Sequence, residues 1–201
     1  MESSSVEVTL ANRLRMERET RNWTLADLAT RSGVSRAMLS KIERCEASPT
    51  AALLGRLSGA FGLTLSQLFA RVQNPSQLAR SAEQPVWRDP ESGFLRRSLS
   101  PPNGEPTAAP LELVWGELPS GAKIDYPAAS YTFIADQQLV VIDGALTIRQ
   151  ADTTYQLLPG DCLRFGHPRE VTFQNPGPSP CRYVLAVLRA TGTTSLDSTR
   201  I

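Results

Sequence analysis

A short helix predicted over residues 36–43 carries side chains suited to contact nucleic acid. With Leu39 and Ile42 packing inward, its outward face comprises Arg36, Ala37, Ser40, Lys41 and Arg44. Cationic side chains neutralise DNA phosphates, and arginine or lysine can also donate hydrogen bonds to base edges in the major groove. We therefore expect Arg36, Ala37 and Lys41 to contact bases, and Arg36 to donate hydrogen bonds to a guanine. The residues expected to hold the helix on the DNA backbone are Ser35, Ser40 and Arg44.

The residues before this helix predict a cap, a tight turn and a second helix. Thr24 and Asp27 have the spacing of a capping box that opens a helix at residue 25, and Thr24 is counted among the DNA-binding candidates. Gly33 can adopt the left-handed backbone that ends a helix, and Ser35 is a strong cap for the next one. Val34 is expected to fill the angle between the two helices. Two short helices joined in this way can place the second one in the major groove.

Residues 24–44 resemble the helix-turn-helix of phage-repressor-like (XRE-type) DNA-binding domains, and the resemblance continues to residue 69. It implies a five-helix bundle, whose first helix is supplied by Leu10 and Leu14. The resemblance also implies that the chain binds a double-stranded DNA operator.

Further capping signals and two departures accompany this resemblance. Ser48 marks the expected start of the fourth helix, and Thr64 with Gln67 forms a second capping box that opens the fifth. Leu25 stands where the family usually places a glutamine that touches a DNA phosphate. Cys45 stands where the family commonly has glycine, so it is expected to need a costly backbone conformation.

The character of the chain changes near residue 72, which predicts two domains. Residues 1–72 hold 10 Lys and Arg against 7 Asp and Glu, a net charge of +3, and the remainder carries −2. The expected organisation is a helix-turn-helix domain over 1–72, a linker over 73–85 with one helical turn around Leu78, a cupin-like β-barrel over 86–190 and a polar tail over 191–201. A modestly basic head on a slightly acidic body suits a protein that binds DNA.

Short alternating or apolar runs after residue 110 predict a sandwich or barrel of at least eight strands. The expected strands are 111–118, 122–126, 138–143, 145–150, 153–158, 161–165, 170–174 and 181–189. Asp143-Gly144 is a strong hairpin signal between two of them, and Pro159-Gly160-Asp161 predicts another turn. The stretch 101–106 is expected to be a long loop.

The order of these strands resembles the cupin family, small double-stranded β-helix (jelly-roll) barrels that hold a metal or a small molecule. Gly144, Gly160 and Asn175 match structural positions of the two cupin motifs. The four positions that hold metal ligands in the family are occupied here by Tyr131, Phe133, Gln137 and Val171. None of these side chains binds Zn, Fe or Mn as imidazole or carboxylate does. We therefore expect no metal, no cofactor and no catalytic residue, and hence no enzyme.

An apolar barrel interior with a few polar groups suits a small-molecule site, although it suits a filled core equally well. The candidate ligand-binding residues are Tyr131, Phe133, Gln137, Leu139, Val141, Val171 and Phe173, with Trp115, Tyr126 and Arg164 as weaker candidates. They follow from the alternation of side chains along the strands around the vacated metal positions.

The remaining chemistry-bearing residues give weaker signals. Cys45, Cys162 and Cys181 lack CxxC spacing, so we expect idle thiols, and the single His167 is expected to be an ordinary loop histidine. The sequence holds no apolar run of about 18 residues and begins with a polar, acidic stretch, which predicts a cytoplasmic protein without a membrane span.

An XRE-type head joined to a cupin body implies a bacterial transcriptional regulator whose barrel dimerises and senses a small metabolite. A homodimer would read two half-sites about 34 Å apart. Two alternatives stay open: a barrel that serves only as a dimerisation scaffold in a constitutive repressor, and a cupin enzyme that carries a DNA-binding head.

Overall fold

The computed structural model describes residues 5–69, 75–102 and 111–190. Its first part is a bundle of five helices, namely α1 (Ser5–Thr20), α2 (Leu25–Ser32), α3 (Arg36–Glu43), α4 (Ala51–Phe61) and α5 (Leu65–Phe69). The expected tail over 191–201, the start of the expected linker and most of the 101–106 loop lie outside the described residues. None of the helices in the described ranges is long and apolar enough to cross a membrane.

Local capping determines where α2 and α3 begin and end, as predicted. The Thr24 hydroxyl accepts from the Asp27 amide at 3.1 Å, and the Thr24 amide donates to the Asp27 carboxylate at 2.8 Å. Gly33 ends α2 in the left-handed conformation, with φ 66°. The Ser35 hydroxyl then accepts from the Met38 amide at 3.2 Å and caps α3.

The predicted start of the fourth helix at Ser48 is wrong, because the cap lies two residues later. The Thr50 hydroxyl accepts from the Leu53 amide at 3.3 Å, so α4 begins at Ala51. Only a hydroxyl three residues before a free amide of the first turn can make this bond, and Ser48 lies too far back. The second capping box is confirmed: the Gln67 amide donates to the Thr64 hydroxyl at 3.1 Å.

The rest of the chain forms two antiparallel sheets, the jelly-roll arrangement that the cupin resemblance implies. The six-stranded sheet has the order β1 (Val86–Arg88), β2 (Leu95–Ser98), β3 (Leu111–Leu118), β10 (Cys181–Arg189), β5 (Ile134–Asp143) and β8 (Cys162–Arg164). The four-stranded sheet has the order β4 (Lys123–Tyr126), β9 (Val171–Gln174), β6 (Leu146–Gln150) and β7 (Thr153–Leu157). The predicted strands are therefore present, and β1 and β2 are additional.

The predicted hairpin at Asp143-Gly144 is wrong, because the strands on its two sides belong to different sheets. β5 pairs with β10 and β8, whereas β6 pairs with β7 and β9. Gly144 has φ 79°, and a Cβ there would lie 2.9 Å from the Cα of Cys181. Glycine is therefore required by a corner at which the chain crosses between the sheets against a neighbouring backbone.

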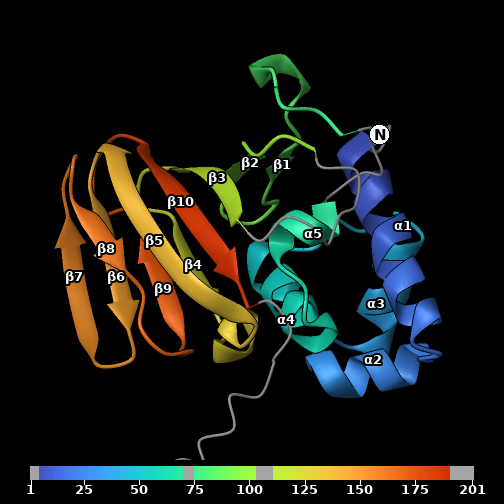
Figure 1. Cartoon of the computed structure of the whole chain (residues 1–201). Helices are drawn as coiled ribbons and strands as arrows, with labels where there is room; N and C mark the ends of the chain where they lie inside the picture. The colour runs from blue at the N-terminus through green and yellow to red at the C-terminus, as the bar shows by residue number, and fades with distance from the viewer. Residues whose placement is uncertain (1–4, 70–74, 103–110, 191–201) are drawn as a thin grey trace, which may run out of the picture.

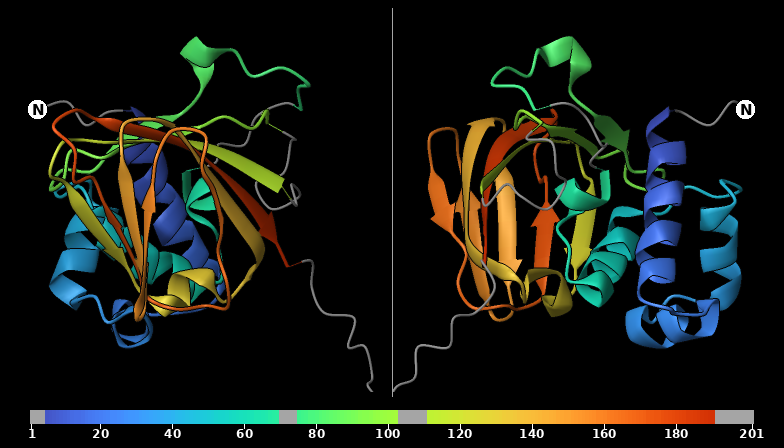
Figure 2. Two further views of the ribbon diagram at one scale, coloured as in Figure 1. Left: turned by 90° about the vertical axis from the view of Figure 1, so that its left-hand side faces the viewer. Right: turned by 45° about the vertical axis from the view of Figure 1, so that its right-hand side comes forward.

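The linker region differs slightly from the prediction, because its one helical turn, η1 (Ser81–Glu83), follows Leu78 instead of surrounding it. A second short helix, η2 (Ala128–Tyr131), precedes β5. Figures 1 and 2 show α4 and α5 lying between the sheets and the other three helices.

The helical bundle and the sheets pack against each other without a break in the apolar core. A Cβ at Gly59 of α4 would lie 2.8 Å from the carbonyl oxygen of Ala129, so the backbones of α4 and η2 nearly touch. The Ser130 hydroxyl donates to the Gly55 carbonyl at 2.9 Å. The bundle thus packs against the same chain segment that enters the barrel.

Candidate DNA-binding surface and interdomain pocket

The α3 helix is held against the bundle by apolar packing on one face and by an ion pair at its end. Val34, Leu39 and Ile42 are buried in the core. At the last residue of α3, Glu43 accepts two bonds from the Arg18 guanidinium of α1, at 2.7 and 2.8 Å. Hydrogen bonding to this carboxylate raises the pKa of Arg18, so the guanidinium stays charged. The orientation of the opposite face of α3 is therefore fixed.

The outward face of α3 carries the side chains expected to touch DNA. Arg36, Ala37 and Lys41 are exposed, and Ser40 is half-buried. Neither the Arg36 nor the Lys41 side chain forms a hydrogen bond or an ion pair with the part of the chain that the structure describes, although Lys41 helps to lower the pKa of the nearby Glu46. Both cations are thus free to bind an external anion.

The other DNA-binding candidates already have partners within the domain. Arg44 forms a two-point ion pair with Glu46, with N–O distances of 2.6 and 2.7 Å, and also donates to Ser40. Thr24 and Ser35 act as helix caps. Arg44 is therefore less available to a phosphate than Arg36 or Lys41, because Glu46 already neutralises it.

The two departures from the family pattern have structural consequences. Leu25 is half-buried and packs against the core, so it cannot contribute a polar contact to a phosphate. Cys45 has φ 58°, and the amides of Cys45 and Glu46 donate to the carbonyls of Ile42 and Lys41 at 3.0 and 2.8 Å. These two bonds form a Schellman cap, in which Cys45 holds the left-handed position that glycine usually takes. The expected left-handed backbone conformation is confirmed.

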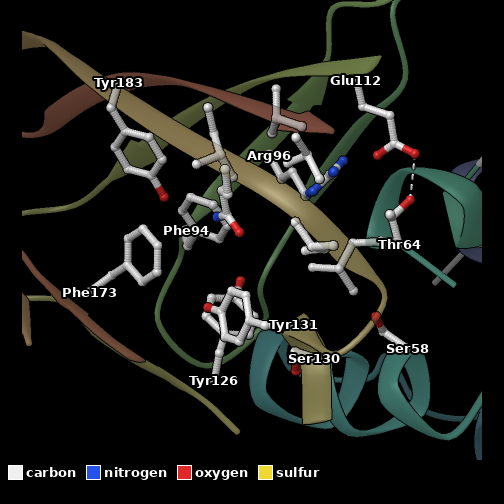
Figure 3. A pocket seen from close by; sticks show the side chains of 16 residues that line it. Ser58, Thr64, Phe94, Arg96, Glu112, Tyr126, Ser130, Tyr131, Phe173 and Tyr183 are labelled. Atoms are coloured by element: carbon white, nitrogen blue, oxygen red, sulfur yellow. Dashed lines mark hydrogen bonds between the residues drawn. The ribbon is translucent and has the colours of Figure 1, made fainter. Parts of the chain in front are cut away.

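A cavity of about 80 Å³ lies between α4 and α5 on one side and the two sheets on the other. Figure 3 shows its labelled lining residues: Ser58 of α4 and Thr64, which caps α5, lie on one side, and the aromatic side chains Phe94, Phe173 and Tyr183 lie on the other. The hydroxyl oxygens of Tyr126, Tyr131 and Tyr183 point toward the middle of the cavity. Burial raises the pKa of each of these tyrosines, so the hydroxyls stay neutral.

The structure brings some of the candidate ligand-binding residues to this cavity and places others elsewhere. Those that line the cavity are Tyr126, Tyr131, Gln137 and Phe173. Leu139, Val141 and Val171 are buried in the apolar core and do not line the cavity. Alternation puts Leu139 and Val141 on the same face of β5 as Gln137, and Val171 on the same face of β9 as Phe173, so they face the barrel interior at other positions along the strands. Of the former metal positions, the cavity therefore includes Tyr131 and Gln137 only.

The last three candidates lie away from the cavity. Strand alternation places Trp115 on the opposite face of β3 from Val114, which lines the cavity. Arg164 is 71% exposed and pairs with Asp136 at 2.9 Å, so it does not enter the barrel. Phe133 is half-buried just before β5 and does not reach the cavity wall.

Two charged residues of the cavity were missed by sequence reasoning. Arg96 of β2 and Glu112 of β3 are 6% and 5% exposed. Arg96 donates to the Ser66 hydroxyl of α5 at 2.7 Å, and Glu112 accepts from the Thr64 hydroxyl at 2.6 Å. For Glu112 a signal existed, because alternation in the predicted 111–118 strand turns it to the same face as Val114.

Comparisons with known proteins agree with this two-part architecture. Residues 14–68 match the helix-turn-helix family HTH_3. The chain is 30% identical over 168 residues to the HTH-type transcriptional regulator SutR of Escherichia coli (strain K12), covering 84% of this chain and 88% of that protein.

Two solved structures are similar as well. An HTH_3 family transcriptional regulator from Vibrio cholerae is 21% identical, with a TM-score of 0.72, over 92% of this chain and 98% of that one. A cupin domain of an XRE family transcriptional regulator from Enterobacter cloacae is 16% identical, with a TM-score of 0.42, over 49% of this chain and 98% of that one.

Proposed function

Because the chain belongs to the family of HTH-type transcriptional regulators, we propose that α3 reads a DNA operator in the major groove and that a small molecule in the interdomain cavity controls this binding. The head comprises residues 1–72 and the cupin-like body residues 86–190, joined by 73–85. The regulator acts in the cytoplasm as a homodimer. Ligand binding favours one placement of the heads over another and shifts operator affinity by the difference in binding free energy.

The observation that carries the DNA-binding proposal is the free cationic face of α3. Arg36 and Lys41 lie on a helix whose opposite face is locked by Leu39 and Ile42. Positive side chains on a rigid helix can neutralise phosphates and donate to base edges without a rearrangement of the domain. Arg36, in the first turn, is placed where recognition helices contact bases.

Fluorescence anisotropy with duplexes selected from a random-sequence pool tests this role. Arg36→Ala should weaken binding of the selected duplex about 5- to 150-fold and relax the preference at one base pair, because a base contact is worth about 1 to 3 kcal/mol. Arg15→Ala is the matched control, since Arg15 is an exposed arginine of α1 that pairs with Glu19. An Arg36→Ala affinity equal to that of the control would refute the recognition-helix assignment.

The outer face of the six-stranded sheet supports the homodimer. Leu111 and Leu113 of β3, Ile142 of β5 and Leu188 of β10 are 50%, 37%, 48% and 40% exposed. Leu188 pairs with Leu111 across the β3–β10 register, so these two apolar side chains lie side by side. Ile142 lies at the opposite end of this face, at the β5–β10 bulge. A sheet face directed to solvent is normally polar, so the cluster of Leu111, Leu113 and Leu188 indicates a protein contact. A second copy of the chain would cover it.

The single observation that supports ligand control is the position of the cavity. Its lining includes residues of α4 and α5 as well as residues of both sheets. A molecule bound there contacts the DNA-binding head and the cupin-like body together, so its binding energy depends on how they are placed. A cupin that served only as a scaffold would have no ligand-dependent operator affinity, which the same anisotropy assay measures.

A further inference from the structure

The interdomain cavity contains one buried positive charge, Arg96, and one buried negative charge, Glu112, which are near enough to interact electrostatically but form no ion pair or hydrogen bond with each other. Among the described residues Arg96 forms no ion pair, and its guanidinium donates to the hydroxyls of Ser66 and Ser98 at 2.7 and 3.2 Å. One oxygen of Glu112 accepts from Thr64, whereas the other, Oε2, has no hydrogen-bond partner in that part of the chain. Buried charges normally have an opposite charge as a partner.

A third polar group of the cavity is also unsatisfied. Gln137 is 5% exposed, and its Oε1 atom has no hydrogen-bond partner in the described part of the chain. Glu112 Oε2 and Gln137 Oε1 are both acceptors, so the group that would satisfy them is a donor such as an ammonium. Arg96 has only donors and needs an anionic acceptor, for which a carboxylate is well matched.

On the basis of the proposed function, we infer that the cavity binds a small zwitterion, an α-amino acid with a short side chain. Its carboxylate accepts hydrogen bonds from Arg96, and its ammonium donates to Glu112 and Gln137. The charges of Arg96 and Glu112 sum to zero, so a ligand with a net charge would leave one buried charge without compensation. A zwitterion compensates both.

The size and the walls of the cavity agree with this class of ligand. A volume of about 80 Å³ holds about five to eight water-sized atoms. Alanine, serine and valine have about six to eight non-hydrogen atoms and fall in this range. Phe94 and Phe173 (Figure 3), together with Leu185, supply apolar walls against which a short side chain can pack.

The ligand would be sensed directly by the DNA-binding head. Thr64 caps α5 and donates to Glu112, while Ser66 in α5 accepts from Arg96. The groups that receive the amino acid are thus the groups that hold α5 against the sheets. A bound ammonium and carboxylate change the strength of both interdomain bonds, and the placement of the head responds.

Isothermal titration calorimetry of the full chain tests the inference with L-alanine, L-serine and L-valine. The comparison ligands are propionate, which lacks the ammonium, and ethylamine, which lacks the carboxylate. We expect at least one amino acid to bind and both comparison ligands to bind at least about tenfold more weakly. Absence of binding by all three amino acids, or equal binding of propionate or ethylamine, would overturn the inference.

Glu112→Gln provides a second test, because it removes the charge but keeps an oxygen that can accept from Thr64. It should weaken amino-acid binding at least about tenfold, whereas Glu83→Gln, at an exposed position of η1, should not. Circular dichroism checks that both variants are folded. If Glu112→Gln binds the amino acid with the same affinity as the wild-type protein, the assignment of Glu112 to the ligand site is contradicted.

Binding of the selected duplex, measured on the same preparations, separates this inference from the proposed function. Duplex binding without amino-acid binding overturns the ligand assignment and leaves the DNA-binding function standing. Amino-acid binding without duplex binding has the opposite meaning: it supports the ligand site and contradicts operator recognition.

Discussion

Replacing Arg18 by methionine is expected to destabilise the DNA-binding head, because Arg18 holds the end of α3 in place. Its guanidinium makes two bonds to Glu43, at 2.7 and 2.8 Å, and donates to the Trp23 carbonyl at 2.9 Å. The two charged side chains are only 13% and 9% exposed. Methionine preserves much of the apolar stem but leaves the Glu43 carboxylate largely buried and unpaired.

The geometry sets the size of the effect. Two unit charges about 4 Å apart attract by about 4 kcal/mol near a protein surface, and breaking one partner of a buried pair costs about 3 to 5 kcal/mol. Because both side chains retain some exposure, we expect a loss of about 3 kcal/mol. For a chain of this length, such a loss lowers Tm by roughly 6 to 12 °C.

Thermal unfolding followed by circular dichroism measures this loss, with Arg15→Met as the matched control. Arg15 lies on the same helix and pairs with Glu19, but its side chain is 62% exposed, so the control should leave Tm nearly unchanged. The double variant Arg18→Met with Glu43→Gln should recover part of the loss, because no buried carboxylate then lacks a partner.

Two results would refute this reasoning. If Arg18→Met unfolds within about 1 °C of the Arg15→Met control, water satisfies Glu43 and the ion pair does not position α3. If the double variant loses as much stability as the two single variants lose together, the two side chains act independently and the loss measured for Arg18→Met has another cause.

Three other changes have defined outcomes. Cys45→Gly should raise the free energy of unfolding, measured in urea, by about 0.5 to 1 kcal/mol. Glycine removes most of the cost of the left-handed backbone at φ 58°, and this gain exceeds the loss of contacts made by the half-buried thiol. A decrease in the free energy of unfolding would show that the thiol contributes more than the backbone conformation costs. Asp27→Asn should lower Tm at pH 7, because hydrogen bonds from the side chain and then the amide of Thr24 hold the pKa of Asp27 below 3.8. That contribution is present above pH 3.8 and is lost as the pH falls through the lowered pKa, so the Tm difference from wild type should vanish in strong acid, and a constant difference would contradict the capping role. Leu113→Glu should convert the proposed homodimer to a monomer in sedimentation velocity, with an unchanged circular dichroism spectrum; a persistent dimer would place the interface elsewhere.

The local features of the helix-turn-helix could be predicted because each depends on contacts within a few residues. The Thr24–Asp27 box spans three residues, the Ser35 cap bonds to the amide of Met38, and Gly33 ends α2 by its own backbone freedom. The same short range explains why the strain at Cys45 was foreseen. A choice between two neighbouring hydroxyls, as at Ser48 and Thr50, already depends on where the helix axis lies.

Features that depend on how strands pair were less accessible. The turn at Asp143-Gly144 has the composition of a hairpin, but pairing with β10 and β8 places β5 in a different sheet from β6. The strand β2 was missed because its one buried side chain is the charged Arg96. An alternating pattern predicts a strand when the buried positions are apolar, and a charged residue is normally expected to be exposed. Turn composition and alternation describe one segment at a time and contain no information about its partner.

The sequence by itself determined the two kinds of domain and the basic face of α3, because periodicity and capping are encoded between near neighbours. Only the tertiary structure decided which polar groups share the cavity. Arg96 contacts Ser66, 30 positions earlier in the chain, and Glu112 contacts Thr64, 48 positions earlier. Such contacts arise when the helical bundle packs against both sheets, and no short-range pattern specifies them.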